Sequence, residues 1–142
     1  MSALYPQSII SAVEMLGTPY LLGAKWAPGT PCAALRGPID CSGFSRWVLS
    51  LDGISIPDGS YNQILVCTKL TPDQQNNPPA LSLGFFQAPG TTAVDHVVIS
   101  TGTGVVIEAR GEPYNCVILR PVSAWIAQQG FLGFYAPPKA NS

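Results

Sequence analysis

The spacing of apolar residues divides the chain into a first half with helical patterns and a second half with strand patterns. Apolar side chains recur every three or four residues after Pro6 and stop at Gly17, which predicts a helix of about three turns. The same spacing begins again at Cys41, and a shorter helical pattern covers residues 61–66. We therefore expect three helices in the first half of the chain, the third of them capped by Ser60.

The second half contains short segments rich in β-branched and aromatic residues, separated by Gly, Pro and Asn, as is typical of strands. These segments are residues 81–86, 94–100, 105–109, 116–120 and 131–135, and residues 123–129 have the pattern of one or two helical turns. Because the helices precede the strands, we expect a single α+β domain over residues 1–142. Its N-terminal helices should pack on one face of an antiparallel sheet.

Composition and charge exclude several classes of function. Charged residues make up 11% of the chain, against about 25% in an average protein, and the net charge is −1 with no basic run. We therefore expect neither a nucleic-acid partner nor a membrane partner. The first residues lack the pattern of a secretory leader, so the sequence predicts a chain that is made in the cytoplasm without one.

The four cysteines are scattered, with no Cys-x-x-Cys pair, and the chain has one histidine. This pattern makes a zinc site of the usual spacing unexpected. Whether any of Cys32, Cys67 and Cys116 form a disulfide stays open.

Cys41 has the position of a reactive thiol. It begins the second predicted helix in the sequence Asp40-Cys41-Ser42-Gly43-Phe44, where Asp40 suits the N-cap position. The free N–H groups and the positive end of the helix dipole would lower the pKa of a thiol there, and they could also bind an oxyanion. A small buried hydrophobic residue is the alternative interpretation of Cys41.

A thiol nucleophile needs a base, and His96 is the sole histidine. Glu108, in the next predicted strand, is the candidate for orienting it, although both can also be ordinary strand positions. If the two strands form a hairpin, a two-residue turn pairs His96 with Ala109 and turns Glu108 to the other face. A loop of odd length, or a bulge at Gly104, should instead bring Glu108 opposite His96.

The order of several motifs resembles the NlpC family of papain-like cell-wall cysteine endopeptidases. The motifs are Gly17-Thr18-Pro19-Tyr20, Asp40-Cys41-Ser42-Gly43-Phe44, Ser60-Tyr61-Asn62-Gln63, Asp95-His96-Val97 and Ile107-Glu108-Ala109. The resemblance implies a papain-like α+β core and cleavage of an amide bond in peptidoglycan stem peptides, commonly the γ-D-glutamyl–diaminopimelate bond, without metal or cofactor. It implies the following site: Cys41 as nucleophile, His96 as base, Glu108 as orienting residue, and Tyr20, Asp40 and Ser42 beside the thiol for the oxyanion or substrate.

Two features depart from the family pattern. Glu108 stands where the family frequently has His and sometimes Asn or Gln, and the segment 81–86 lacks the usual acidic residue. The long insertion 25–38 is similar to what we expect in a phage- or prophage-associated member. A phage-tail or secretion-system assembly, release during lysis, or an immunity partner would then fit a chain without a leader.

Two other classes of function remain open at the level of sequence. One is a thiol amidase or acyltransferase that uses the same residues on a substrate outside the cell wall. The other is a catalytically silent structural domain of a phage tail. Arg36, Arg46 and Arg110 are candidates for binding a stem-peptide carboxylate, with plain surface charge as the alternative.

Overall fold

The computed structural model describes residues 6–140. Its helices are α1 (Gln7–Glu14), the 3-10 turn η1 (Cys32–Ala34), α2 (Cys41–Ser50), α3 (Ser60–Val66), α4 (Pro72–Gln75) and α5 (Val122–Ile126). Its strands are β1 (Thr68–Lys69), β2 (Leu83–Gln87), β3 (Val94–Ser100), β4 (Val105–Arg110), β5 (Cys116–Pro121) and β6 (Phe131–Ala136). No helix in this range has the length and apolar character that crossing a membrane requires. The five predicted strands and the predicted turn of helix after β5 are confirmed.

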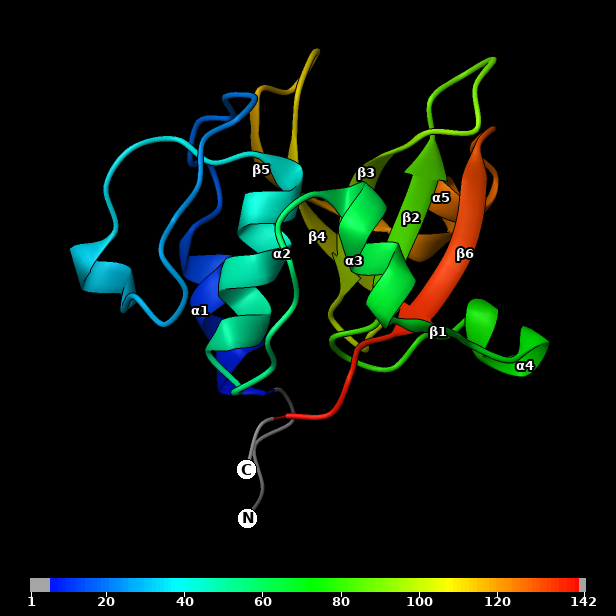
Figure 1. Cartoon of the computed structure of the whole chain (residues 1–142), viewed down its shortest axis with the longest axis horizontal. Helices are drawn as coiled ribbons and strands as arrows, with labels where there is room; N and C mark the ends of the chain where they lie inside the picture. Colours follow the sequence, from blue (N-terminus) through cyan, green and yellow to red (C-terminus); the bar gives the residue numbers. More distant parts are fainter. Residues whose placement is uncertain (1–5, 141–142) are drawn as a thin grey trace.

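The strands form one antiparallel sheet in the order β1-β6-β2-β3-β4-β5, with α1, α2 and α3 on one side and α5 on the other (Figure 1). Alternate residues along each strand face opposite sides of the sheet. Phe85, Ile99 and Ile107 therefore pack in the larger core together with Phe44 of α2. Val98 faces the opposite side and joins a smaller cluster built around Trp125 of α5. The expectation of an α+β fold with N-terminal helices on an antiparallel sheet is confirmed, and α5 adds a second covered face.

Helix α1 buries a different face from the one that its largest apolar residues suggest. Ile9 is buried, but Val13 is 41% exposed. The buried line of the helix runs through the small residues Ser8 and Ala12, which allow close approach to α2, and the Ser8 hydroxyl donates to Asp52 at 2.5 Å. The helix also ends at Glu14, earlier than predicted.

The predicted N-cap of α3 is wrong. Ser60 is the first residue of the helix, and Gly59 occupies the cap position with a φ of +85°. The Ser60 hydroxyl instead donates to the backbone oxygen of Val94 at 3.3 Å, which ties α3 to the start of β3. The local pattern could not reveal this because the acceptor comes from a distant strand.

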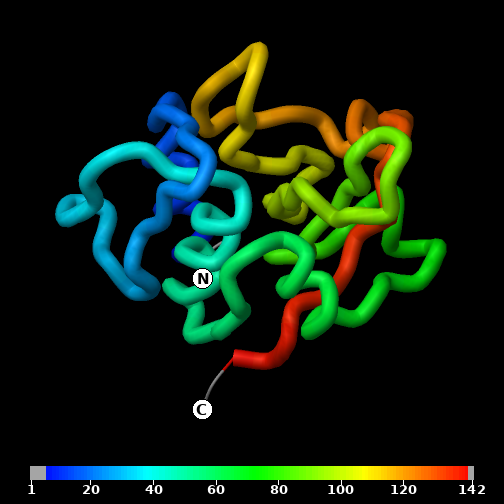
Figure 2. The backbone as a smooth tube through the Cα atoms, turned by 45° about the horizontal axis from the view of Figure 1, so that its top comes forward, coloured from blue at the N-terminus to red at the C-terminus, as the bar shows by residue number. Residues whose placement is uncertain are grey.

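The segment between α1 and α2 loops out on the side of these helices away from the sheet (Figure 2). Trp26 packs edge-on against Trp47 of α2, with ring centroids 5.1 Å apart. The Trp47 indole N–H donates to the backbone oxygen of Thr30 at 2.8 Å. Most of the long loop is therefore anchored on the outer face of α2, and its first part, through Lys25, reaches the residues around Cys41.

Candidate active site

Helix α2 begins at Cys41, as the sequence predicts. Asp40 has extended backbone geometry, and its carboxylate accepts a hydrogen bond from the Gly43 N–H at 2.7 Å, which confirms it as the N-cap residue. Within residues 6–140, the N–H groups of Cys41 and Ser42 have no hydrogen-bond acceptor. Two backbone donors therefore stay available beside the thiol, at the positive end of the helix dipole.

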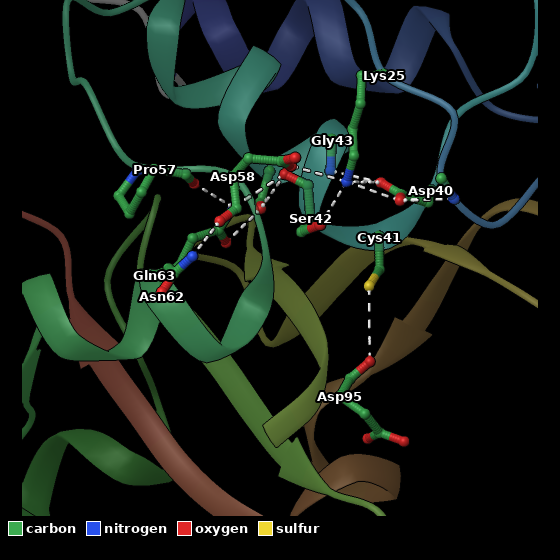
Figure 3. A network of polar contacts seen from close by, with 12 residues as sticks. Lys25, Asp40, Cys41, Ser42, Gly43, Pro57, Asp58, Asn62, Gln63 and Asp95 are labelled. Carbon is green, nitrogen blue, oxygen red and sulfur yellow. Dashed lines mark hydrogen bonds and ion pairs between the residues drawn. The ribbon is translucent and has the colours of Figure 1, made fainter. Parts of the chain in front are cut away.

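The Asp40 carboxylate is part of an ionic network (Figure 3). Lys25 Nζ lies 2.7 Å from an oxygen of Asp40 and 2.7 Å from an oxygen of Asp58, and it donates to the Ser42 hydroxyl at 2.9 Å. Partial burial lowers the pKa of Lys25, but the hydrogen bonds to the two carboxylates outweigh it and raise the pKa. Asp40 also accepts from the Gly23 N–H at 3.0 Å. The Asp40 carboxylate thus links the first turn of α2 to Gly23 and Lys25 beside the thiol. A substrate-binding role for Asp40 and Ser42 stays a prediction.

Sequence reasoning missed Lys25 because it lies outside the motif that it supports. It also missed the role of Gln63, which is fully buried. The Gln63 amide nitrogen donates to the backbone oxygens of Ser42 at 2.9 Å and Pro57 at 3.0 Å, and its oxygen accepts from the Ser45 hydroxyl at 2.7 Å. These bonds fix the first turn of α2 against the loop that leads into α3.

The structure brings together the three residues predicted as nucleophile, base and orienting group. His96 Nε2 lies 2.7 Å from Glu108 Oε1, and the Cys41 side chain is close enough to His96 to contribute to raising its pKa. The thiol sulfur is also 3.9 Å from the backbone oxygen of Asp95. The imidazole is therefore paired with the carboxylate and is near the thiol, as a Cys–His–acid site requires.

Burial lowers the pKa of His96, but the hydrogen bonds and charges of Cys41 and Glu108 outweigh burial and raise the pKa to about 9. His96 is thus an imidazolium at neutral pH. A neighbouring imidazolium stabilises a thiolate, which is the nucleophilic form of cysteine.

The hairpin between β3 and β4 has the odd-length loop that the triad required. Thr101 N–H donates to the Val105 oxygen at 2.9 Å across residues 102–104, and Ser100 pairs with Val106. The expectation that Glu108 lies directly opposite His96 is wrong, because this register, continued, places Glu108 opposite Val98. His96 and Glu108 still share a face as diagonal neighbours, within reach of long side chains. Strands β3 and β4 are paired only next to the loop, at Ile99 with Ile107 and Ser100 with Val106. The side chains of His96 and Glu108 therefore meet where the two strands are no longer paired.

Glu108 is fully buried on the α5 side of the sheet. Its second oxygen accepts a hydrogen bond from the Trp125 indole N–H at 2.7 Å, and Arg110 Nη1 lies 3.5 Å from its first oxygen. Two donors and one nearby cation therefore compensate the buried charge. The role of Trp125 could not be predicted from the sequence, because its partner is 17 positions earlier, on another element.

Tyr20 is half-buried near the thiol. Burial, followed by the negative charges of Cys41, Asp40 and Asp95, raises the pKa of Tyr20 to about 12. The hydroxyl therefore keeps its proton at neutral pH and can act as a donor.

Of the other sequence candidates, Arg36 folds back onto the backbone oxygens of its own loop, and the thiols of all four cysteines are free.

A helix that begins with a cysteine, packed against a sheet that supplies histidine and glutamate, defines this chain as a papain-like α+β domain. The model of the NlpC/P60 family matches residues 17–135. Since this match covers most of the chain, the chain belongs to the NlpC/P60 family.

Solved structures of NlpC/P60 proteins are similar to this chain. The NlpC/p60 domain of the peptidoglycan hydrolase SagA is 27% identical, with a TM-score of 0.64, 93% of this chain covered and 96% of that one. The peptidoglycan hydrolase RipB of Mycobacterium tuberculosis is 25% identical, with a TM-score of 0.66, 91% of this chain covered and 61% of that one. An NLP/P60 lipoprotein-like protein of Staphylococcus aureus is also 25% identical, with a TM-score of 0.68 and 93% of this chain covered.

The chain spans 40% of the staphylococcal protein and 61% of RipB. RipD of Mycobacterium tuberculosis, described as a non-catalytic NlpC/p60 domain protein, shares the fold with a TM-score of 0.66 at 21% identity, with 91% of this chain covered and 92% of that one. No curated protein sequence matches the chain. Family membership therefore leaves catalysis to be argued from the site, and the expected phage association stays a prediction.

Proposed function

We propose that this chain is a cysteine endopeptidase that cleaves amide bonds in peptidoglycan stem peptides, with the γ-D-glutamyl–diaminopimelate bond as its target. The observation that carries the proposal is that His96, which the Cys41 side chain is close enough to influence, lies 2.7 Å from the buried carboxylate of Glu108. The likeness to the peptidoglycan hydrolases SagA and RipB supports the choice of substrate.

The first half of the reaction forms a thioester. The Cys41 thiolate attacks the carbonyl carbon of the scissile amide, and negative charge develops on the carbonyl oxygen. We assign the binding of that oxyanion to the N–H groups of Cys41 and Ser42 and to the hydroxyl of Tyr20. The His96 imidazolium then gives its proton to the amide nitrogen as the carbon–nitrogen bond breaks, and the amine product leaves.

The second half regenerates the enzyme. The now neutral His96 takes a proton from water, the resulting hydroxide attacks the thioester carbon, and the carbon–sulfur bond breaks to release the thiolate and a carboxylic acid, which gives its proton to the solvent. Glu108 holds the imidazole ring in place through both halves and stabilises its charged form. Trp125 acts on the base indirectly, by holding Glu108.

Digestion of purified peptidoglycan tests the proposal. We expect the wild-type chain to release fragments that end in γ-D-glutamate, identified by mass spectrometry, and Cys41→Ala to release none. Cys67→Ala is the matched control, because burial raises the pKa of that thiol to about 11 and it lies outside the site. Intact muropeptides after wild-type digestion, across walls of several stem-peptide types, would refute the proposal.

A second measurement separates the remaining alternatives. Site-resolved alkylation with iodoacetamide at neutral pH should modify Cys41 much faster than Cys67. Fast alkylation without wall cleavage would favour a thiol amidase or acyltransferase on another substrate. Slow alkylation of Cys41 would favour a catalytically silent domain.

A further inference from the structure

A pocket of about 220 Å³ opens beside His96 on the side of the sheet that α5 covers. Its walls include Asp95, His96, Arg110, Trp125 and Gln128. Cys41 is not among its lining residues, so the pocket touches the base without touching the nucleophile.

This position relates the pocket to one half of the substrate. In the proposed mechanism the acyl half of the substrate becomes attached to Cys41, while the amine half receives its proton from His96. A pocket that contacts His96 and not Cys41 is therefore placed to hold the residue on the amine side of the cleaved bond.

Arg110 gives the pocket a cation with unused hydrogen-bonding capacity. Its side chain is 20% exposed, and its buried Nη1 has no hydrogen-bond acceptor within the described residues. The guanidinium lies 3.5 Å from Glu108 and 4.3 Å above the Trp125 ring. Glu108 is paired with one guanidinium nitrogen, Nη1, and accepts no hydrogen bond from it, because its two oxygens are directed at the donors of His96 and Trp125.

The local charge balance also favours an anion. Two cations line the pocket, the Arg110 guanidinium and the His96 imidazolium, and both lie beside the one buried carboxylate of Glu108. Burial, and then the nearby charge of Arg120, lower the pKa of Arg110, whereas Glu108 opposes this. Asp95 is the opposing charge at the pocket, and it lies at an exposed position where water screens it.

We propose that this pocket binds a carboxylate carried by the residue on the amine side of the cleaved bond, and that Arg110 recognises it. A guanidinium matches a carboxylate with two parallel hydrogen bonds, which gives both affinity and orientation. Binding there would hold the leaving amine against His96. The inference rests on the proposed function, because it assigns the two halves of the substrate by the roles of Cys41 and His96.

Two peptides that differ in this carboxylate test the proposal. The probes are L-Ala-γ-D-Glu-meso-diaminopimelate and the same peptide with both diaminopimelyl carboxylates converted to carboxamides. Because a hydrogen bond to a charged group contributes about 1.5–3 kcal/mol, we expect kcat/KM of the wild type to favour the acid by about 10- to 100-fold. In Arg110→Met this ratio should fall to about 1, and in Arg110→Lys it should be intermediate.

Arg120→Met is the matched control, since Arg120 stacks on the same ring but does not line the pocket. It should keep the wild-type ratio of the two kcat/KM values. Equal cleavage of both peptides by the wild type, or an unchanged ratio in Arg110→Met, would overturn the carboxylate pocket while leaving the endopeptidase proposal intact.

Cleavage of neither peptide would instead count against the proposed function, and the pocket can then be tested by binding alone. The ring signals of His96 are followed by NMR during titration with free diaminopimelate and with its diamide. Shifts caused by the acid, absent with the diamide and lost in Arg110→Met, would support the pocket. Identical responses to both compounds, or no response to either, would overturn it.

Discussion

Replacing Glu108 by Gln tests how the site keeps His96 charged. The substitution preserves shape, but it removes one of the two groups that raise the pKa of His96 from 6.5 to about 9. We therefore expect the pKa of His96 to fall toward 6.5 in Glu108→Gln. At pH 7 the imidazolium fraction would drop from nearly all molecules to as little as about a quarter.

The chain allows a direct measurement, because it contains one histidine. NMR titration of the untagged protein gives a single set of imidazole signals, which belong to His96. The alkaline limb of kcat/KM should move to lower pH together with the NMR midpoint, since the imidazolium must protonate the leaving amine. A wild-type midpoint near 6.5, or a midpoint that stays near 9 in Glu108→Gln, would refute the reasoning.

The same substitution should also destabilise the fold. Two N–H donors point at the carboxylate, from His96 and from Trp125, each at 2.7 Å. A glutamine amide has one oxygen, so whichever way it turns, one donor faces an NH₂ group. We expect a loss of about 1.5–3 kcal/mol in the free energy of unfolding, measured with urea. In the double variant Glu108→Gln with Trp125→Phe, the loss in free energy of unfolding should be smaller than the sum of the two single losses. The reason is that the Trp125 N–H, one of the two donors that conflict with the glutamine amide, is then absent.

Three further predictions concern the surroundings of the thiol. In Gly43→Ala the new Cβ would lie 2.8 Å from an oxygen of the capping carboxylate, so urea unfolding should show a loss of about 1–3 kcal/mol. Gly111→Ala, whose nearest contact would be 3.4 Å, should change little. Lys25→Met leaves the carboxylates of Asp40 and Asp58 without their shared cation, so the free energy of unfolding in urea should fall by about 1–3 kcal/mol. Lys139→Met is the control, because Lys139 is exposed, and it should leave this free energy unchanged. Tyr20→Phe should lower kcat/KM by about 100-fold with an unchanged circular dichroism spectrum, and an unaltered kcat/KM would exclude the hydroxyl from the oxyanion site.

The parts of the fold that local chemistry determines could be predicted from the sequence. The start of α2 follows from Asp40, whose side chain reaches the backbone three residues ahead. Residues 94–100 and 105–109 follow from their β-branched composition, and the glycines at 102 and 104 allow the loop of odd length, with φ values of +87° and +82°. Each of these signals acts within a few residues of the chain.

The parts that could not be predicted depend on partners that are distant in the sequence. Strand β1 has two residues and exists because it pairs with the end of β6. Gln75 holds the neighbouring backbone by accepting from Phe134 N–H at 2.6 Å, a contact across 59 positions. Trp125 likewise acquires its role from Glu108. Hydrophobic spacing carries no information on which polar side chains will meet across elements, because that depends on the assembled sheet.

The surroundings of Glu108 give a physical reason why an acid can occupy a position where the resemblance implies a neutral residue or a histidine. A fully buried carboxylate is costly unless it is paired and hydrogen-bonded. Here His96, Trp125 and Arg110 supply two N–H donors and a neighbouring cation around it. Removing the acid alone would leave buried donors and cations without their acceptor, so these residues should have to change together. Which residue can stand at position 108 therefore depends on the whole cluster on the α5 face of the sheet. The residue at this position in turn governs the pKa of His96.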